Sequence, residues 1–147
     1  PVKSISNETT FGEDITDPDL LDGHLWRLSE KVADRAKAKA LAGRVVTLKL
    51  KHSDHRTITR RHALREPTQL ADTLYRAVRG LMAQVPGGAA WRLIGVGLSE
   101  LGADTEADRA GDLLDPDAPR RAGAERATDA IRARFGRDVI VKGRALR

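Results

Sequence analysis

One stretch of the chain, residues 44–65, holds all of its net positive charge. It carries seven basic residues against one acid, a local net charge of +6, whereas the whole chain of 147 residues has a formal net charge of +5. Within the stretch, residues 46–51 alternate apolar and polar side chains with a period of two, which is typical of a half-buried β-strand. The alternation turns Val46, Leu48 and Leu50 toward a core and leaves a cationic outer face.

A second strand is expected after a short turn. The Ser and Asp side chains within residues 52–55 can hydrogen-bond their own backbone, and the β-branched run 57–59 then predicts the returning arm of a hairpin. Strict alternation puts Arg60 and Arg61 on opposite faces of this arm. Because two adjacent arginines cannot both face outward from a regular strand, we expect a bulge or an irregular end near them.

The flanking segments predict four further elements. Thr16, Asp17 and Pro18 form a helix start, with a capping side chain followed by proline in the first turn. The expected elements are a strand over residues 3–11, a helix over 18–42 that ends at Gly43, the hairpin, a helix that starts at residues 66–68 and stops at 86–88, and a last strand over 91–101.

This order predicts an α+β fold of the split β-α-β-β-α-β type, a four-stranded sheet with two helices on one face. The other face is left open and cationic, and it carries Thr47, Lys49, Lys51, Thr59 and Arg61 beside the last strand. Two glycines of that strand, at positions 95 and 97, fall in phase on the open face. Glycine in a strand indicates close approach of a ligand or of another backbone, so room for a neighbouring loop is the alternative explanation.

Composition suggests three parts. Residues 1–101 form one folded domain, residues 102–118 read as a flexible acidic linker with six acids against one arginine, and residues 119–147 read as a C-terminal helical tail. The chain has no cysteine, which suits a reducing cytoplasm, and no apolar run long enough for a membrane helix, so we expect no membrane partner. It also starts without Met, and its first strand follows almost at once, which favours a piece of a larger protein.

Catalysis by this chain is not expected. His52, His55 and His62 are the one histidine cluster that could hold a metal, but neighbouring arginines repel a cation and zinc sites normally take four ligands. No phosphate-binding loop, nucleophile elbow or zinc-protease motif is present. We therefore predict no catalytic residue, no metal site and no cofactor in this chain.

Nucleic-acid binding has positive support in the sequence pI of about 10 and in the charge of one hairpin. Aromatic residues make up only 3% of the chain, and none falls on the outer face of the hairpin. Sheets that read single strands stack bases on exposed aromatic side chains. The open face is therefore expected to grip sugar-phosphate backbone without reading bases.

Four segments, in order, resemble the little finger of Y-family translesion DNA polymerases of the DinB, or DNA polymerase IV, group. They are KSISNETTF at 3–11, GRVVTLKLK at 43–51, TRRHALREPT at 59–68 and RLIGVGLSEL at 92–101. The segment ERATDAIRARFGRDVIVKGRAL at 125–146 also resembles the C-terminal tail of longer members. Four ordered motifs are far more specific than any one alone.

The resemblance implies a domain that lays its sheet in the major groove of primer-template duplex and is joined to a polymerase catalytic core in the same polypeptide. With Lys51 added from the cationic face, the implied DNA contacts are Ser4, Ile5, Ser6, Thr47, Lys49, Lys51, Thr59, Arg60, Arg61, Arg92 and Leu93. Two of them depart from the family pattern, because Ser6 stands where the family has Gly and Arg61 where it has Ser. The carboxylates that bind the family's two magnesium ions are absent from this chain.

The sliding clamp is a second implied partner. Long family members often carry a clamp-binding peptide in the segment that here is acidic, and residues 110–114 keep only the last part of it, ending in Leu113 and Leu114. Two alternatives therefore stand beside the DNA-binding module. One is a protein-interaction module that docks on the clamp or the polymerase core, and the other is a free-standing RNA-binding domain, against which the scarce aromatics and the polymerase-like motifs both argue.

Overall fold

The computed structural model describes residues 2–108 and residue 125. The elements are β1 (Ser4–Ile15), α1 (Pro18–Ala38), β2 (Leu41–His52), β3 (Thr57–Thr68), α2 (Ala71–Ala83), β4 (Trp91–Ala103) and a short 3-10 helix η1 (Asp104–Glu106). The four strands form one antiparallel sheet in the order β1-β4-β2-β3. The expected β-α-β-β-α-β fold is thus confirmed.

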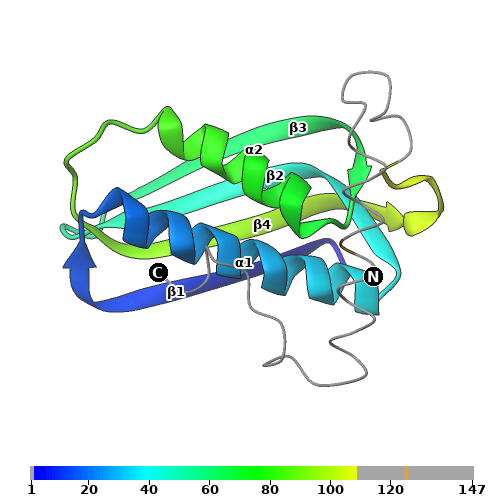
Figure 1. Cartoon of the computed structure of the whole chain (residues 1–147), viewed down its shortest axis with the longest axis horizontal. Helices are drawn as coiled ribbons and strands as arrows, with labels where there is room; N and C mark the ends of the chain where they lie inside the picture. Colours follow the sequence, from blue (N-terminus) through cyan, green and yellow to red (C-terminus); the bar gives the residue numbers. More distant parts are fainter. Residues whose placement is uncertain (1, 109–124, 126–147) are drawn as a thin grey trace.

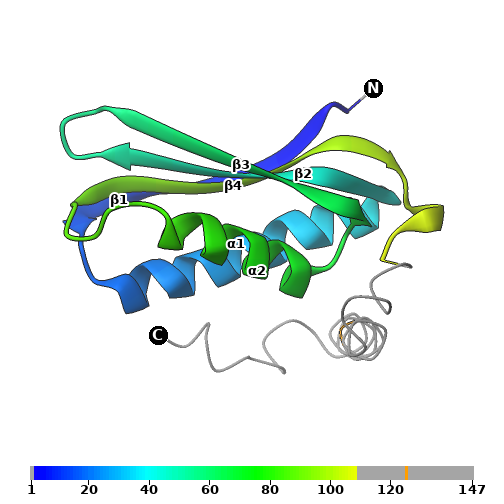
Figure 2. The same ribbon diagram turned by 90° about the horizontal axis from the view of Figure 1, so that it is seen from above.

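The sheet and the helices form two layers. Both helices pack on one face of the sheet, and within the described residues no element covers the other face (Figure 1 and Figure 2). Alternate residues of the central strands fill the space between the layers, with Val46, Leu48, Leu50 and Ile94 fully buried. Apolar side chains from one face of each helix also lie in this core, as the 3.6-residue period of a helix requires of a two-layer domain.

Helix α1 begins where the sequence indicates and ends earlier than expected. The Asp17 carboxylate accepts a hydrogen bond of 2.9 Å from the Asp19 backbone N–H, which caps the first turn. The helix stops at Ala38, and Ala40 takes a left-handed conformation (φ 53°) that leads directly into β2. The prediction that Gly43 ends the helix is wrong, because Gly43 lies inside β2.

Gly43 has a packing role in that strand. A Cβ atom at this position would lie 2.6 Å from Leu98 Cγ and 2.7 Å from the Ser99 carbonyl oxygen. Neither neighbour can move freely, since Leu98 is in the core and the carbonyl belongs to the central strand β4. Only glycine fits this position.

Residues 66–68 do not start the second helix. They complete β3, where Thr68 is paired with Gly43, and α2 begins three residues later at Ala71. The Thr68 hydroxyl accepts the backbone N–H of Leu70 at 3.1 Å and so directs the chain from the strand into the helix. Pro67 is tolerated in β3 because β3 is an edge strand.

The expected bulge near Arg60 and Arg61 is not present. Strands β2 and β3 pair without interruption from Lys51 opposite Thr57 to Val45 opposite Ala63, and the register shift lies beyond Ala63. The two arginines do face opposite ways. Both are exposed because β3 is the edge of the sheet, so a regular strand accommodates them.

Strands β1 and β4, like β2 and β3, are longer than the sequence indicates. Strand β1 extends to Ile15 instead of residue 11, with an irregularity after Thr10, and β4 extends to Ala103. Residues 104–108 pack back on the domain, where the Asp108 backbone N–H donates to the Pro67 carbonyl at 3.0 Å. Apart from Glu125, the expected linker beyond residue 108 and the expected helical tail lie outside the described residues. No helix in the described part is long and apolar enough to cross a membrane.

Candidate nucleic-acid interface

The sheet face opposite the helices, hereafter the open face, presents short polar and cationic side chains from all four strands. Directly opposite residues of antiparallel strands lie on the same face. The registers give four rows across β1, β4, β2 and β3: Ser4, Ser99, Val45 and Ala63; Ser6, Gly97, Thr47 and Arg61; Glu8, Gly95, Lys49 and Thr59; Thr10, Leu93, Lys51 and Thr57.

These rows bring together eight of the sequence-predicted contact residues, namely Ser4, Ser6, Thr47, Lys49, Lys51, Thr59, Arg61 and Leu93. Leu93 is largely covered by its neighbours on this face, with 8% of its surface exposed. The other seven residues supply hydroxyl and cationic groups. Such groups are the usual donors to phosphate oxygens in protein–DNA contacts.

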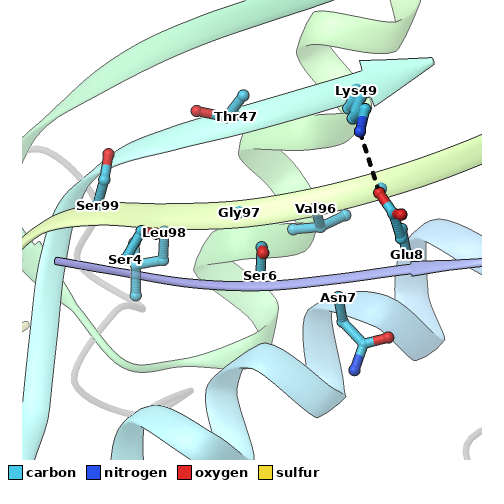
Figure 3. Close-up of a pocket in the computed structure, with 11 residues that line it drawn as sticks. Ser4, Ser6, Asn7, Glu8, Thr47, Lys49, Val96, Gly97, Leu98 and Ser99 are labelled. Atoms are coloured by element: carbon cyan, nitrogen blue, oxygen red, sulfur yellow. Dashed lines mark hydrogen bonds and ion pairs between the residues drawn. The ribbon is translucent and has the colours of Figure 1, made fainter. Parts of the chain in front are cut away.

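A shallow groove runs along β4 in the middle of this face. Figure 3 shows Gly97 at its floor, with Ser6 of β1 on one side and Thr47 of β2 on the other. A Cβ atom at Gly97 would lie 3.6 Å from the Ser6 Cβ and 3.8 Å from the Thr47 Cβ, which is ordinary contact. The fold therefore does not require glycine at this position.

Gly95, the other in-phase glycine, is more confined. A Cβ atom there would lie 3.1 Å from the Glu8 Cβ, so a side chain would press on β1. Room for a neighbouring element is thus part of the explanation for Gly95, but that element is strand β1 and not the loop that the alternative interpretation named. At Gly97 the space above the strand opens outward, so it is accessible to a ligand of the open face.

The charges of the open face are only partly neutralised. Lys49 Nζ lies 3.3 Å from Glu8 Oε2, and both side chains are about half exposed, at 46% and 51%. Exposed pairs of this kind contribute little to stability, so Lys49 can exchange Glu8 for another anion at small cost. Within residues 2–108 and 125, Lys51 and Arg61 form no ion pair. Their charges are available to a phosphate.

Three predicted contact residues do not present their side chains on the open face. Ile5 is paired with Leu98 and is buried against the helices at 4% exposure. Arg60 is opposite the core residue Leu48, so it points to the helical side at the sheet edge, where its guanidinium donates to the Thr59 carbonyl at 3.1 Å. Ile5 and Arg60 could meet DNA on the open face only through their backbone.

Arg92, the third, occupies an irregularity at the start of β4. Its neighbours Trp91 and Leu93 have partners on both adjacent strands, whereas Arg92 has none. Its Nε donates to Asp14 Oδ1 at 2.5 Å, which ties β4 to the end of β1. The ion pair accounts for this arginine within the fold.

Sequence reasoning missed Glu8, an acid in the middle of the open face. The alternation that places Ser4 and Ser6 on this face also places Glu8 and Thr10 there, so the signal was present. It was not used because residues 3–11 carry too few apolar side chains to show which face is inward. Glu8 lowers the net charge of the groove where Lys49 raises it.

The aromatic side chains are absent from the open face of the described structure. Phe11, Trp26, Tyr75 and Trp91 are all at least nine-tenths buried. Trp26 and Tyr75 contact each other edge to face, with ring centroids 5.3 Å apart, between the two helices. The described residues therefore offer no platform on which unpaired bases could stack.

The three hairpin histidines do not converge. The His52 ring packs on edge against Trp91 with centroids 5.5 Å apart, His55 lies in a left-handed turn (φ 74°), and His62 is far along β3, opposite Val46. Within residues 2–108 and 125, no three side chains of the His, Cys, Asp and Glu types lie close enough to hold a metal ion.

Comparison with known protein families gives a direct match. The sequence profile of the impB/mucB/samB family C-terminal domain matches residues 2–113. Among curated proteins, the chain is 47% identical over 146 residues to the DNA polymerase IV of Caulobacter vibrioides, covering 99% of this chain and 36% of that protein. It is 42% identical over 142 residues to the DNA polymerase IV of Brucella melitensis, covering 97% and 32%.

Solved structures agree on the fold. One is the complex of the beta-clamp processivity factor and the little finger domain of PolIV, with a TM-score of 0.56 and 24% identity over 73% of this chain and 96% of that one. Another is the insertion ternary complex of Dbh DNA polymerase, with a TM-score of 0.53 and 13% identity over 67% of this chain and 30% of that one. At these identities the likeness shows the fold alone.

Within the described residues, a split β-α-β-β-α-β sheet with both helices on one side and an uncovered cationic face on the other defines the class, a two-layer α+β module. The chain belongs to the impB/mucB/samB C-terminal domains, the little finger domains of Y-family polymerases of the DNA polymerase IV group. It spans about a third of the length of the curated relatives it matches.

Proposed function

We propose that this little finger binds the sugar-phosphate backbone of primer-template duplex through its open face, in the major groove and without base readout. The observation that carries the proposal is the row Ser6, Gly97, Thr47 and Arg61. In this row two hydroxyls lie on either side of a position of β4 that has no side chain, and a guanidinium lies next to them on β3. A phosphate group needs donors of this kind and room for close approach. The row supplies both.

The absence of exposed aromatic rings from the described sheet supports duplex over single strands as the ligand. The same absence of exposed aromatic rings argues against the alternative of a free-standing RNA-binding domain. Duplex backbone also suits a flat face, because phosphates recur along the groove at regular spacing and need no stacking pocket. Lys49, Lys51 and Arg61 lie in three neighbouring rows of this face and can meet successive phosphates.

The polymerase chemistry belongs to the remainder of the parent protein. Relatives named DNA polymerase IV are about three times as long as this chain, which leaves about two thirds of their length for a catalytic core. The two magnesium ions of such a core would be held there by carboxylates that this chain does not contain. Within the whole protein, the little finger would hold the duplex while the core extends the primer.

Docking on the sliding clamp is the second candidate. A little finger domain has been solved in complex with the beta-clamp processivity factor, and its fold is similar to this one. The peptide remnant at Leu113 and Leu114 lies outside the described residues. Clamp binding that survives replacement of both leucines by alanine would support a docking surface on the folded domain, and loss of binding would assign the interaction to the peptide.

The DNA proposal is tested by reversing charge on the two sides of one strand. Arg61→Glu changes the open face, and Arg60→Glu makes the same change one residue away on the helical side. Fluorescence anisotropy with a labelled primer-template duplex measures both. Each phosphate contact contributes about 0.9 to the change in log affinity for every tenfold change in salt concentration. One contact therefore strengthens binding roughly eightfold when the salt concentration falls from 1 M to 0.1 M, and a variant without the contact lacks this gain.

We expect Arg61→Glu to weaken binding by about that factor on any sequence, and Arg60→Glu to have a clearly smaller effect. Lys31→Glu, on the exposed side of α1, controls for net charge alone. Equal losses for all three variants would mean that total charge, not the open face, drives binding. A loss restricted to one DNA sequence would contradict recognition of the backbone.

A further inference from the structure

Helix α2 begins without a capping side chain of its own. Its N-cap residue is Leu70, whose side chain offers no hydrogen-bond acceptor. The first backbone N–H groups of a helix have no partner within it, and they carry a partial positive charge. In this structure the carboxylate of a residue far along the sequence accepts hydrogen bonds from two of these N–H groups. Ala71 N–H donates to Glu125 Oε2 at 3.0 Å, and Asp72 N–H donates to Glu125 Oε1 at 3.2 Å.

A lysine from the other helix completes the site. Lys37 Nζ of α1 lies 2.6 Å from Glu125 Oε2, and the Glu125 residue is only 7% exposed. Burial of a carboxylate is costly unless it is paired and hydrogen-bonded. Two backbone donors and an ammonium group meet that requirement, so Ala71, Asp72 and Lys37 form a socket that fits a carboxylate.

A second acid is anchored at the same end of α2. Asp108 accepts a hydrogen bond of 2.6 Å from the Thr68 hydroxyl and one of 3.4 Å from the Gln69 backbone N–H. Sixteen residues, 109–124, separate the two anchored acids in sequence. Both ends of this segment are therefore fixed at one place on the folded domain.

We infer that the socket of Lys37 and the α2 N-terminus is a docking site for the chain's own C-terminal segment, which it holds through Glu125. The contact ties the residues after the little finger fold to the helical side of the domain. The socket lies on the helical side of the domain, across the core from the DNA-binding rows of the open face.

The inference does not depend on the proposed DNA binding, and the test keeps the two apart. Amide proton resonances of Ala71 and Asp72 are followed by NMR in the full 147-residue chain. Glu125→Gln removes the charge from the socket, and Asp129→Asn makes a matched change four residues later. We expect the two amide resonances to move in Glu125→Gln alone, and their hydrogen exchange to speed up about 2- to 30-fold, the effect of losing a helix cap.

A second measurement keeps the inference testable if Glu125→Gln perturbs the fold. Lys37→Gln removes the ammonium without touching the tail, and Lys31→Gln is its control on the same helix. Trypsin should cut after Arg126 several-fold faster in Lys37→Gln than in Lys31→Gln, because release of the neighbouring Glu125 frees the cleavage site. Equal cleavage rates, or Ala71 and Asp72 amides that do not respond to Glu125→Gln, would overturn the docking site. Unchanged DNA affinity in both variants is the expected companion result.

Discussion

Gly97 is a position where a substitution should weaken ligand binding without lowering the stability of the fold. Its backbone lies at the floor of the groove between Ser6 and Thr47, and a Cβ atom there would lie at ordinary contact distances of 3.6 and 3.8 Å from the Cβ atoms of these two neighbours. Replacement by valine, a strand-favouring residue, should leave stability unchanged or raise it by about 0.5–1 kcal/mol, the usual cost of glycine in a strand interior. The same side chain would stand between the strand and an approaching phosphate.

The effect on binding follows from what valine blocks. If the Ser6 and Thr47 hydroxyls each donate to phosphate, loss of the two hydrogen bonds at about 0.5–1.5 kcal/mol apiece weakens binding about 5- to 150-fold. Urea unfolding and anisotropy with a primer-template duplex measure the two quantities on one sample. A stable Gly97→Val protein with wild-type affinity would refute the role of the groove, and a strongly destabilised one would refute the packing argument.

Three further changes probe the fold that holds this face. Gly43→Ala should lower stability by about 1–3 kcal/mol in urea unfolding, because its Cβ would lie 2.6 Å from Leu98 Cγ. Tyr75→Phe should cost about 1.5–3 kcal/mol in the same assay, since the buried hydroxyl donates to the Asp22 carboxylate at 2.7 Å and 2.8 Å. Burial, and secondarily a nearby arginine, lowers the pKa of His24 below its usual 6.5. The unfolded chain then binds the proton more readily, so the contribution of His24 to stability should be full above pH 6.5 and be lost as the pH drops through the folded-state pKa. His24→Gln should flatten this fall in stability. An unchanged pH profile in His24→Gln would exclude this residue as the cause.

The regular parts of the fold could be predicted because their patterns are local. Period-two alternation in residues 46–51 and the in-phase glycines of β4 correctly assign the two faces of the central strands. The cap at Asp17 likewise fixes the start of α1. In each case the side chains that decide the structure are adjacent in sequence.

The errors arise where tertiary contacts decide. Gly43 and residues 66–68 resemble helix boundaries locally, yet strand pairing between Gly43 and Thr68 places both in the sheet. The bulge expected at Arg60 and Arg61 is unnecessary because the edge strand is exposed on both faces at these two residues, and the position of β3 at the edge depends on strand order.

The candidate site shows the same division. The cationic side of the hairpin follows from alternation. The family motifs alone also select three residues whose side chains do not face DNA: Ile5 lies in the core, Arg60 lies on the helical side and Arg92 forms an ion pair. A motif indicates which segments meet a ligand and not which atoms do. The socket that holds Glu125 had no sequence signal, because its partners lie 53 to 88 positions away.

The most direct measurement of the central claim is the salt dependence of affinity for primer-template duplex. Anisotropy titrations at several salt concentrations, on two unrelated DNA sequences, give the slope of log affinity against log salt. Three contacts, one each from Lys49, Lys51 and Arg61, predict a slope of about −2.7, with the same affinity for both sequences. A flat dependence, or a strong preference for one sequence, would contradict an open face that grips the phosphate backbone.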